Sequence, residues 1–134
     1  MTLRLIETGS VGTWGMYRIN DEVNLLVKYS ATPKERHNAT RWDFVVSRRE
    51  IKELSNGTTW LALVCGASAL RSTEMEVCLL DPYQLKSLFH FKGLQESAYV
   101  ERKQGTSLRV GPTKAGPELV LARNRIETWK VPGS

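Results

Sequence analysis

One local unit occurs twice in this sequence: a short apolar strand, a helix N-cap residue and the beginning of an amphipathic helix. In the first copy, strand 42–46 is followed by Ser47, with Glu50 three positions further on. This spacing is typical of a capping box, in which the two side chains satisfy backbone N–H groups that the first helical turn leaves free. The pattern predicts a helix over about 48–55.

The second copy carries an additional helix-start signal. Strand 76–80 precedes Asp81, Pro82 occupies the first helical position, and Gln84 completes the capping box. Proline suits that position because its ring presets the helical φ angle and its missing N–H is not needed there. A second helix is therefore predicted over about 82–91.

Patterns typical of strands dominate the rest of the chain. The apolar runs 14–19 and 23–29 flank Asn20-Asp21-Glu22, which predicts a β-hairpin. Run 60–65 is almost continuously apolar and indicates a central strand buried on both faces. Because strands predominate and helices are inserted among them, we expect an α+β fold with a mostly antiparallel β-sheet and two short amphipathic helices. Further strands are predicted at 3–7, 98–100, 107–110, 118–122 and 126–131.

The length of 134 residues predicts a single domain over 1–134, large enough to fold without a disulfide or a structural metal. Segment 30–41 is polar and predicts a long surface loop, and residues 132–134 form a tail. Both cysteines, Cys65 and Cys78, fall inside apolar strands without a Cys-x-x-Cys spacing. We therefore expect two buried, reduced thiols.

Several kinds of site and location are disfavoured by the sequence. No apolar run approaches the roughly 20 residues of a membrane helix, and the first residues lack the layout of a secretory signal. The two histidines and two cysteines have no zinc-ligand spacing, and no glycine-rich phosphate loop is present. We expect a cytoplasmic protein with no cofactor, no metal and no membrane partner.

The charge distribution favours an anionic partner. The net charge is +5, and basic side chains gather in 30–41 and from residue 101 onward. Such a surface neutralises phosphates, and aromatic side chains within it can stack on bases; Trp42, Tyr99 and Trp129 lie among these residues. The leading hypothesis is a non-enzymatic domain that binds nucleic acid. The expected contact residues are Lys34, Arg36, Arg41, Arg102, Lys103, Arg109, Arg123 and Arg125.

Protein–protein interaction is an alternative hypothesis. A strand-rich domain with an exposed sheet edge can pair with a strand of another protein. The chain also has four tryptophans, a residue type enriched at binding hot spots. It would then be a small regulatory or immunity-type subunit of a larger assembly.

A divergent Mg²⁺-dependent nuclease is the second alternative. Its chemistry needs carboxylates that hold the metal and a lysine near the attacking water. The restriction-endonuclease-like pattern has an (Asp/Glu)-x-Lys triplet, whereas the corresponding triplet here begins with Leu26. The chain departs from that pattern at a required carboxylate, and no other catalytic set is assigned. The candidate residues of this alternative are Asp21, Glu22, Lys28 and Asp43.

Overall fold

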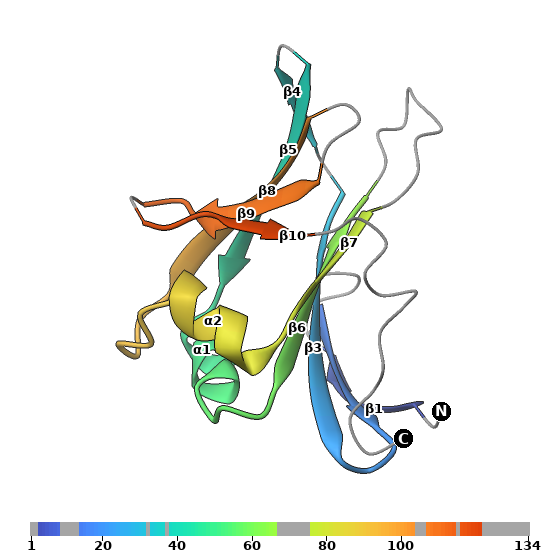
Figure 1. Cartoon of the computed structure of the whole chain (residues 1–134). Coiled ribbons are helices and arrows are strands. Elements are labelled where there is room, and N and C mark those ends of the chain that lie inside the picture. Colours follow the sequence, from blue (N-terminus) through green and yellow to red (C-terminus); the bar gives the residue numbers. More distant parts are fainter. Residues whose placement is uncertain are drawn as a thin grey trace.

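The computed structural model describes residues 3–8, 14–31, 33–36, 38–66, 76–103, 107–114 and 116–121. These residues form two five-stranded sheets and two helices (Figure 1). Sheet A comprises β1 (Leu3–Thr8), β2 (Trp14–Ile19), β3 (Val23–Ser30), β6 (Trp60–Cys65) and β7 (Glu76–Leu80). Sheet B comprises β4 (Lys34–Arg36), β5 (Ala39–Val46), β8 (Glu96–Lys103), β9 (Leu108–Pro112) and β10 (Leu119–Leu121). The helices are α1 (Arg48–Leu54) and α2 (Pro82–Leu88).

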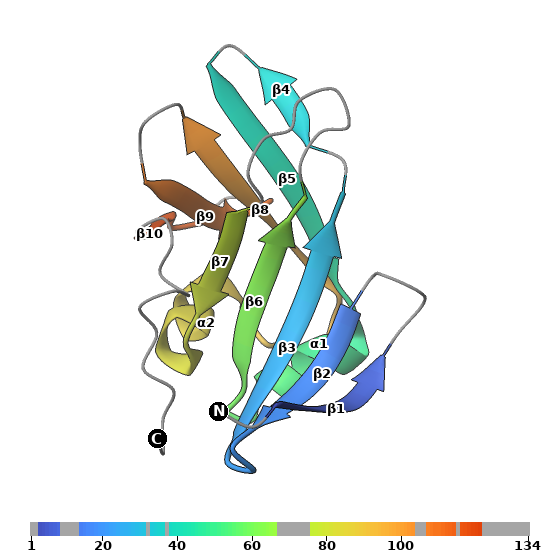
Figure 2. The same cartoon turned by 90° about the vertical axis from the view of Figure 1, so that its right-hand side faces the viewer.

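The strand-rich α+β class is confirmed, but the strands are divided between two sheets rather than one. Sheet A has the order β1-β2-β3-β6-β7, and sheet B has the order β10-β9-β8-β5-β4. The neighbours within each sheet are antiparallel, except that β3 and β6 are parallel, as the arrows in Figure 2 show. Between these two strands the chain crosses to sheet B, forms β4 and β5 and returns through α1.

Both predicted capping boxes are present. The Ser47 hydroxyl accepts from the Glu50 backbone N–H at 3.2 Å, and the Asp81 carboxylate accepts from the Gln84 backbone N–H at 2.8 Å. In each case the side chain of the third helical residue, Glu50 or Gln84, accepts a hydrogen bond from the backbone N–H of the cap residue. The local signals that predicted where the helices start are therefore realised as hydrogen bonds.

The second helix ends at Leu88, three residues earlier than predicted. The backbone N–H groups of His90 and Phe91 donate to the Glu96 carboxylate at 2.8 and 3.1 Å. Phe91 also has a left-handed φ of 55°, which an α-helix does not allow. A carboxylate from β8 thus takes up N–H groups that a longer helix would have used internally. The first helix also ends one residue early, at Leu54.

The structure confirms one of the two predicted connections between strands and contradicts the other. The predicted β2–β3 hairpin is confirmed, and Asn20 and Asp21 hold left-handed φ angles of 53° and 56°. The predicted loop 30–41 is wrong, because β4 pairs with the start of β5 across a turn at Asn38, φ 61°. This hairpin projects beyond the rest of sheet B (Figure 1). Its residues are mostly polar, so it lacks the apolar alternation by which strands are recognised.

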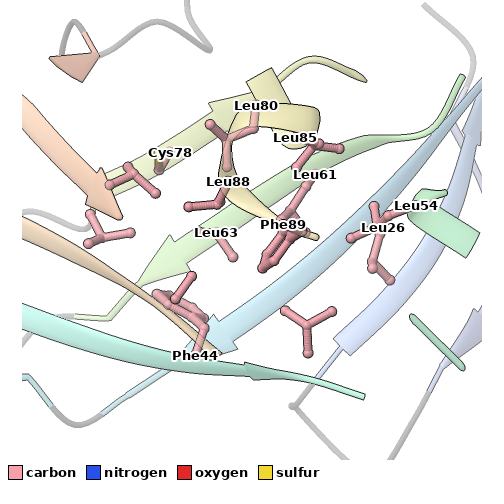
Figure 3. Close-up of a cluster of buried hydrophobic side chains, with 14 of the residues drawn as sticks. Leu26, Phe44, Leu54, Leu61, Leu63, Cys78, Leu80, Leu85, Leu88 and Phe89 are labelled. Carbon is pink, nitrogen blue, oxygen red and sulfur yellow. The ribbon is translucent and has the colours of Figure 1, made fainter. Parts of the chain in front are cut away.

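One core fills the space between the inner faces of the two sheets. It contains side chains from both sheets and from both helices, and Figure 3 shows how α2 contributes Leu85 and Leu88 to the same space as Phe44 of sheet B and Leu63 of sheet A. Strand β6 is buried on both faces, as expected from its composition. On the outer face of sheet A a second cluster of buried residues consists of Ile19, Val23, Leu25, Ala62 and Leu79.

The two cysteines are buried and not linked, as predicted. Cys65 lies opposite Glu76 and Cys78 lies opposite Leu63, so the two thiols are diagonal rather than direct neighbours on β6 and β7. Burial, with smaller contributions from Cys78 and Glu76, raises the pKa of the Cys65 thiol well above its usual range. This thiol is therefore a small apolar core group rather than a nucleophile.

Two buried ion pairs lie at the boundary of this core. Lys28 of β3 donates to the Glu50 carboxylate of α1 at 2.9 Å, and both side chains are almost fully buried. Arg102 of β8 donates to the carboxylate of Glu76 on β7 at 2.8 Å and so links sheet B to sheet A. The indole N–H of Trp42 crosses the same space and donates to the carbonyl of Gly66 at 2.8 Å.

The Lys28–Glu50 pair gives a stability prediction. Glu50→Gln keeps the shape and the acceptor of the capping box but leaves the Lys28 ammonium buried without its counter-charge. We expect a loss of about 3 kcal/mol in the free energy of unfolding, measured by urea denaturation. Adding Lys28→Met to Glu50→Gln removes the uncompensated charge and should recover most of that loss. If the double variant is no more stable than Glu50→Gln alone, the ion pair does not determine the stability of this region.

Candidate nucleic-acid interface

The outer face of sheet B is set by the alternation of side chains along its strands. In β5, Trp42 and Phe44 are buried in the core, whereas Asp43 and Val45 are exposed. Since paired residues of antiparallel strands point to the same side, the register of β5 fixes which residues of β4, β8 and β9 share this outer face.

The register places four charged residues in one row across the outer face. Lys34 pairs with Arg41, Arg41 with Glu101, and Glu101 with Arg109. Neighbouring strands are about 4.8 Å apart, so the row extends over roughly 14 Å. Lys103 stands on the same face, opposite Ala39. Four predicted contact residues, Lys34, Arg41, Lys103 and Arg109, are thus brought together.

The basic side chains belong to a network with nearby carboxylates. Asp43 lies 3.3 Å from the Lys34 ammonium and accepts from Arg41 at 3.1 Å. Further along the row, the Glu118 carboxylate accepts from Arg109 at 3.2 Å. These pairs are at the surface, where each contributes at most about 1 kcal/mol, so an arriving phosphate can compete for the cations.

Tyr99 occupies the centre of this network. The Arg41 guanidinium lies 4.2 Å from the centroid of the Tyr99 ring, and the phenol donates to the Glu118 carboxylate. A Cβ at position 111 would stand 2.7 Å from the phenol oxygen, so Gly111 provides the space in which the ring lies. Tyr99 is therefore fixed by Arg41 and Glu118 in the space that Gly111 leaves, and the Arg41 guanidinium lies over its ring.

The protonation of these groups disfavours a nucleophilic role for Tyr99. Burial and the hydrogen bond to Glu118 raise the pKa of Tyr99 to about 12. The hydrogen bonds from Tyr99 and Arg109 lower the pKa of the Glu118 carboxyl. At neutral pH the phenol is thus a neutral donor and Glu118 is an anion, which leaves the phenol without the activation that a nucleophile needs.

Other predicted contact residues are placed differently. Arg102 points into the space between the sheets, where it pairs with Glu76 and lies 5.7 Å from the Trp42 ring. Its guanidinium is therefore engaged in holding the sheets together, and Trp42 is a core residue rather than a stacking platform. The backbone of Arg36 lies in β4, but its side chain is not among those described. Arg123, Arg125 and Trp129 lie outside the described residues.

The residues of the nuclease hypothesis are not brought together. Asp21 and Glu22 are exposed at the β2–β3 turn, where Asp21 pairs with Arg4 at 3.3 Å. Lys28 is seven residues further along, roughly 20 Å away in an extended strand, and it pairs with Glu50. Asp43 belongs to sheet B. Within the described residues, no three Asp, Glu, His or Cys side chains gather as a metal site would require.

Sequence reasoning missed Glu118 and Gly111 as members of the interface. Glu118 is a single acidic residue just before β10, and only the pairing of β9 with β10 brings it next to Arg109. Gly111 had a weak signal, since a glycine within a strand often marks a close approach of another group.

Comparison of the chain with family models, with curated proteins and with solved structures finds no match. Neither of the helices in the described part of the chain is long and apolar enough to cross a membrane.

The Tyr99–Glu118 hydrogen bond predicts a shift in titration. Glu118→Gln removes the anion that stabilises the protonated phenol, so the pKa of Tyr99 should fall from about 12 toward 10. Tyrosinate absorbance during an alkaline titration measures this shift, and Tyr99→Phe identifies which transition belongs to Tyr99. Because the folded-state pKa is raised, the stability that this group contributes is present below pH 10 and is lost as the pH rises toward 12. An identical titration in the wild type and Glu118→Gln would contradict the assignment.

Proposed function

We propose that the protein binds single-stranded nucleic acid on the outer face of sheet B. The observation that carries this proposal is the row of Lys34, Arg41 and Arg109 on one face of sheet B, with Lys103 beside it. The Lys34 and Arg109 side chains are 67% and 43% exposed, so their charges are accessible to a phosphate. Binding rather than catalysis, in the cytoplasm and without a cofactor, is the activity that we propose.

The shape of the face favours a single strand over a duplex. Proteins that read duplex DNA commonly insert a helix into the major groove, whereas open sheets bind unpaired strands by stacking and backbone contacts. Here α1 and α2 each bury part of their surface in the core between the sheets. The outer face of sheet B instead offers the Arg41 guanidinium as a plane for stacking and the neighbouring cations for phosphates.

Three of the four edges of the described sheets, all except β7, give less support to a partner that adds a strand. The edge strands of sheet B, β4 and β10, have three residues each, and β1 of sheet A contains a register shift between Leu5 and Glu7. Short and irregular edges are features by which proteins discourage pairing with another chain. Strand addition is therefore the weaker proposal for these edges.

The proposal predicts the effect of removing one cation at a time. Arg41→Gln and Arg109→Gln should each weaken binding of a labelled single-stranded oligonucleotide in fluorescence anisotropy. Arg109→Gln should also reduce the slope of log affinity against log salt by about 0.7, because one phosphate contact is lost.

The matched control is Arg4→Gln, which removes the same charge from an exposed residue of sheet A that pairs with Asp21. Its affinity should remain close to that of the wild type. Equal losses in all three variants would assign the effect to net charge alone. Absence of binding by the wild type would reject the proposal, and Mg²⁺-dependent loss of the oligonucleotide would favour the nuclease alternative instead.

A further inference from the structure

Two cavities are lined in part by sheet B and share two residues, Ser97 and Thr113. The first has a volume of about 320 Å³ and extends from Lys34 and Arg41 to Val45, Ser97 and Thr113. The second has a volume of about 390 Å³ and is lined by Ser97 and Thr113 together with the loop after α2 and the end of β9. Since Ser97 and Thr113 line both, the two cavities adjoin at these residues, and together they are called the groove.

The joint between the cavities consists of two small residues, Ser97 and Thr113, that a backbone hydrogen bond holds together. The Thr113 backbone N–H donates to the Ser97 carbonyl at 3.0 Å, which ties the end of β9 to β8. Ser97 pairs with Val45, four residues along β5 from Arg41, so the joint lies roughly 14 Å from the basic row. Serine and threonine have short side chains, and their hydroxyl groups can hydrogen-bond to a base or a sugar.

The far end of the groove is preformed. Glu96 fastens the loop that follows α2 by accepting from the His90 and Phe91 backbone N–H groups. Arg48 of α1 holds the same loop through the carbonyl of Gly93 at 3.1 Å. This loop therefore needs little ordering when a ligand binds, which reduces the entropic cost of binding.

The charges at the far end are positive. Lys92 and Lys114 line the second cavity and are exposed, and His90 lies beside them. Glu96 is the one carboxylate among the described residues of this cavity, and it is occupied by backbone N–H groups. The groove thus has cations at both ends and small polar groups between them, and at the first end Asp43 pairs with Lys34 and Arg41. Exposed Val45 and Leu94 add apolar surface along it.

We infer that a single strand of nucleic acid runs lengthwise through this groove, from Lys34 and Arg41, past Ser97 and Thr113, to Lys92 and Lys114. This inference rests on the proposed function and adds the direction of the strand and a second set of contacts. Phosphates lie at the two basic ends, and the sugars and bases between them contact the hydroxyl groups and the apolar surface.

The test compares oligonucleotides of about 4 and about 16 nucleotides, the range of site sizes of sheet-based single-strand binders. The double variant Lys92→Gln/Lys114→Gln should bind the longer oligonucleotide severalfold more weakly. Its salt slope should fall by about 1.4, because two phosphate contacts are lost. Affinity for the short oligonucleotide, which the basic row can hold alone, should change little.

Two further variants sharpen the test. Thr113→Trp places a bulky side chain at the exposed joint and should also weaken binding of the longer oligonucleotide selectively. The control Arg4→Gln/Lys52→Gln removes two charges from exposed residues of β1 and α1 and should behave as the wild type. Thermal unfolding confirms that each variant is folded.

The possible results distinguish the groove inference from the proposed function on which it rests. If Lys92→Gln/Lys114→Gln behaves as the control while Arg41→Gln and Arg109→Gln still lose affinity, the strand takes another path and the groove inference is overturned. If the wild type binds neither oligonucleotide, the proposed function fails first. Competition by a polyglutamate peptide at equal or higher affinity would assign the groove to an acidic protein segment and overturn both.

Discussion

The carboxylate of Glu50 is the contact on which the arrangement of the two sheets depends. It accepts from the backbone N–H of Ser47, immediately after β5 of sheet B, and from the ammonium of Lys28 in sheet A, both at 2.9 Å. A single side chain thus fixes the start of α1 and connects it to the opposite sheet. Arg102 and Glu76 provide a second connection. Removing one partner of a buried pair is costly, so these contacts fix the spacing between the sheets.

The parts of the fold that depend on nearby residues could be predicted from the sequence. The capping boxes at Ser47 and Asp81 and the turn at Asn20 and Asp21 follow from contacts within three or four residues. The division into two sheets could not be predicted, because apolar patterning shows that a strand is buried but not which strand lies beside it. The early end of α2 was also not predicted, because it depends on Glu96, which lies five and six residues beyond the N–H groups that it accepts from and carries no local helix-stop pattern.

The same distinction applies to the candidate site. Basic composition nominated Lys34, Arg41 and Arg109 as candidate contact residues, but only the strand register shows that they share a face. Arg102 was indistinguishable from its neighbour in the sequence, yet it belongs to the opposite side of β8 and pairs with Glu76. Side chains alternate along a strand, so a run of basic residues divides between solvent and core. The pairing register of the strand decides which of these basic residues face the solvent.

The parallel pairing of β3 with β6 also bears on the order in which the chain folds. The β2–β3 hairpin can form from adjacent residues, whereas β3 meets β6 only after the intervening chain has crossed to sheet B and returned. Contacts between such distant segments form late because closing the long loop costs entropy. Until then β3 has an open edge and several apolar side chains, which are features that promote aggregation. A newly synthesised chain is therefore most vulnerable to self-association while β6 is still missing.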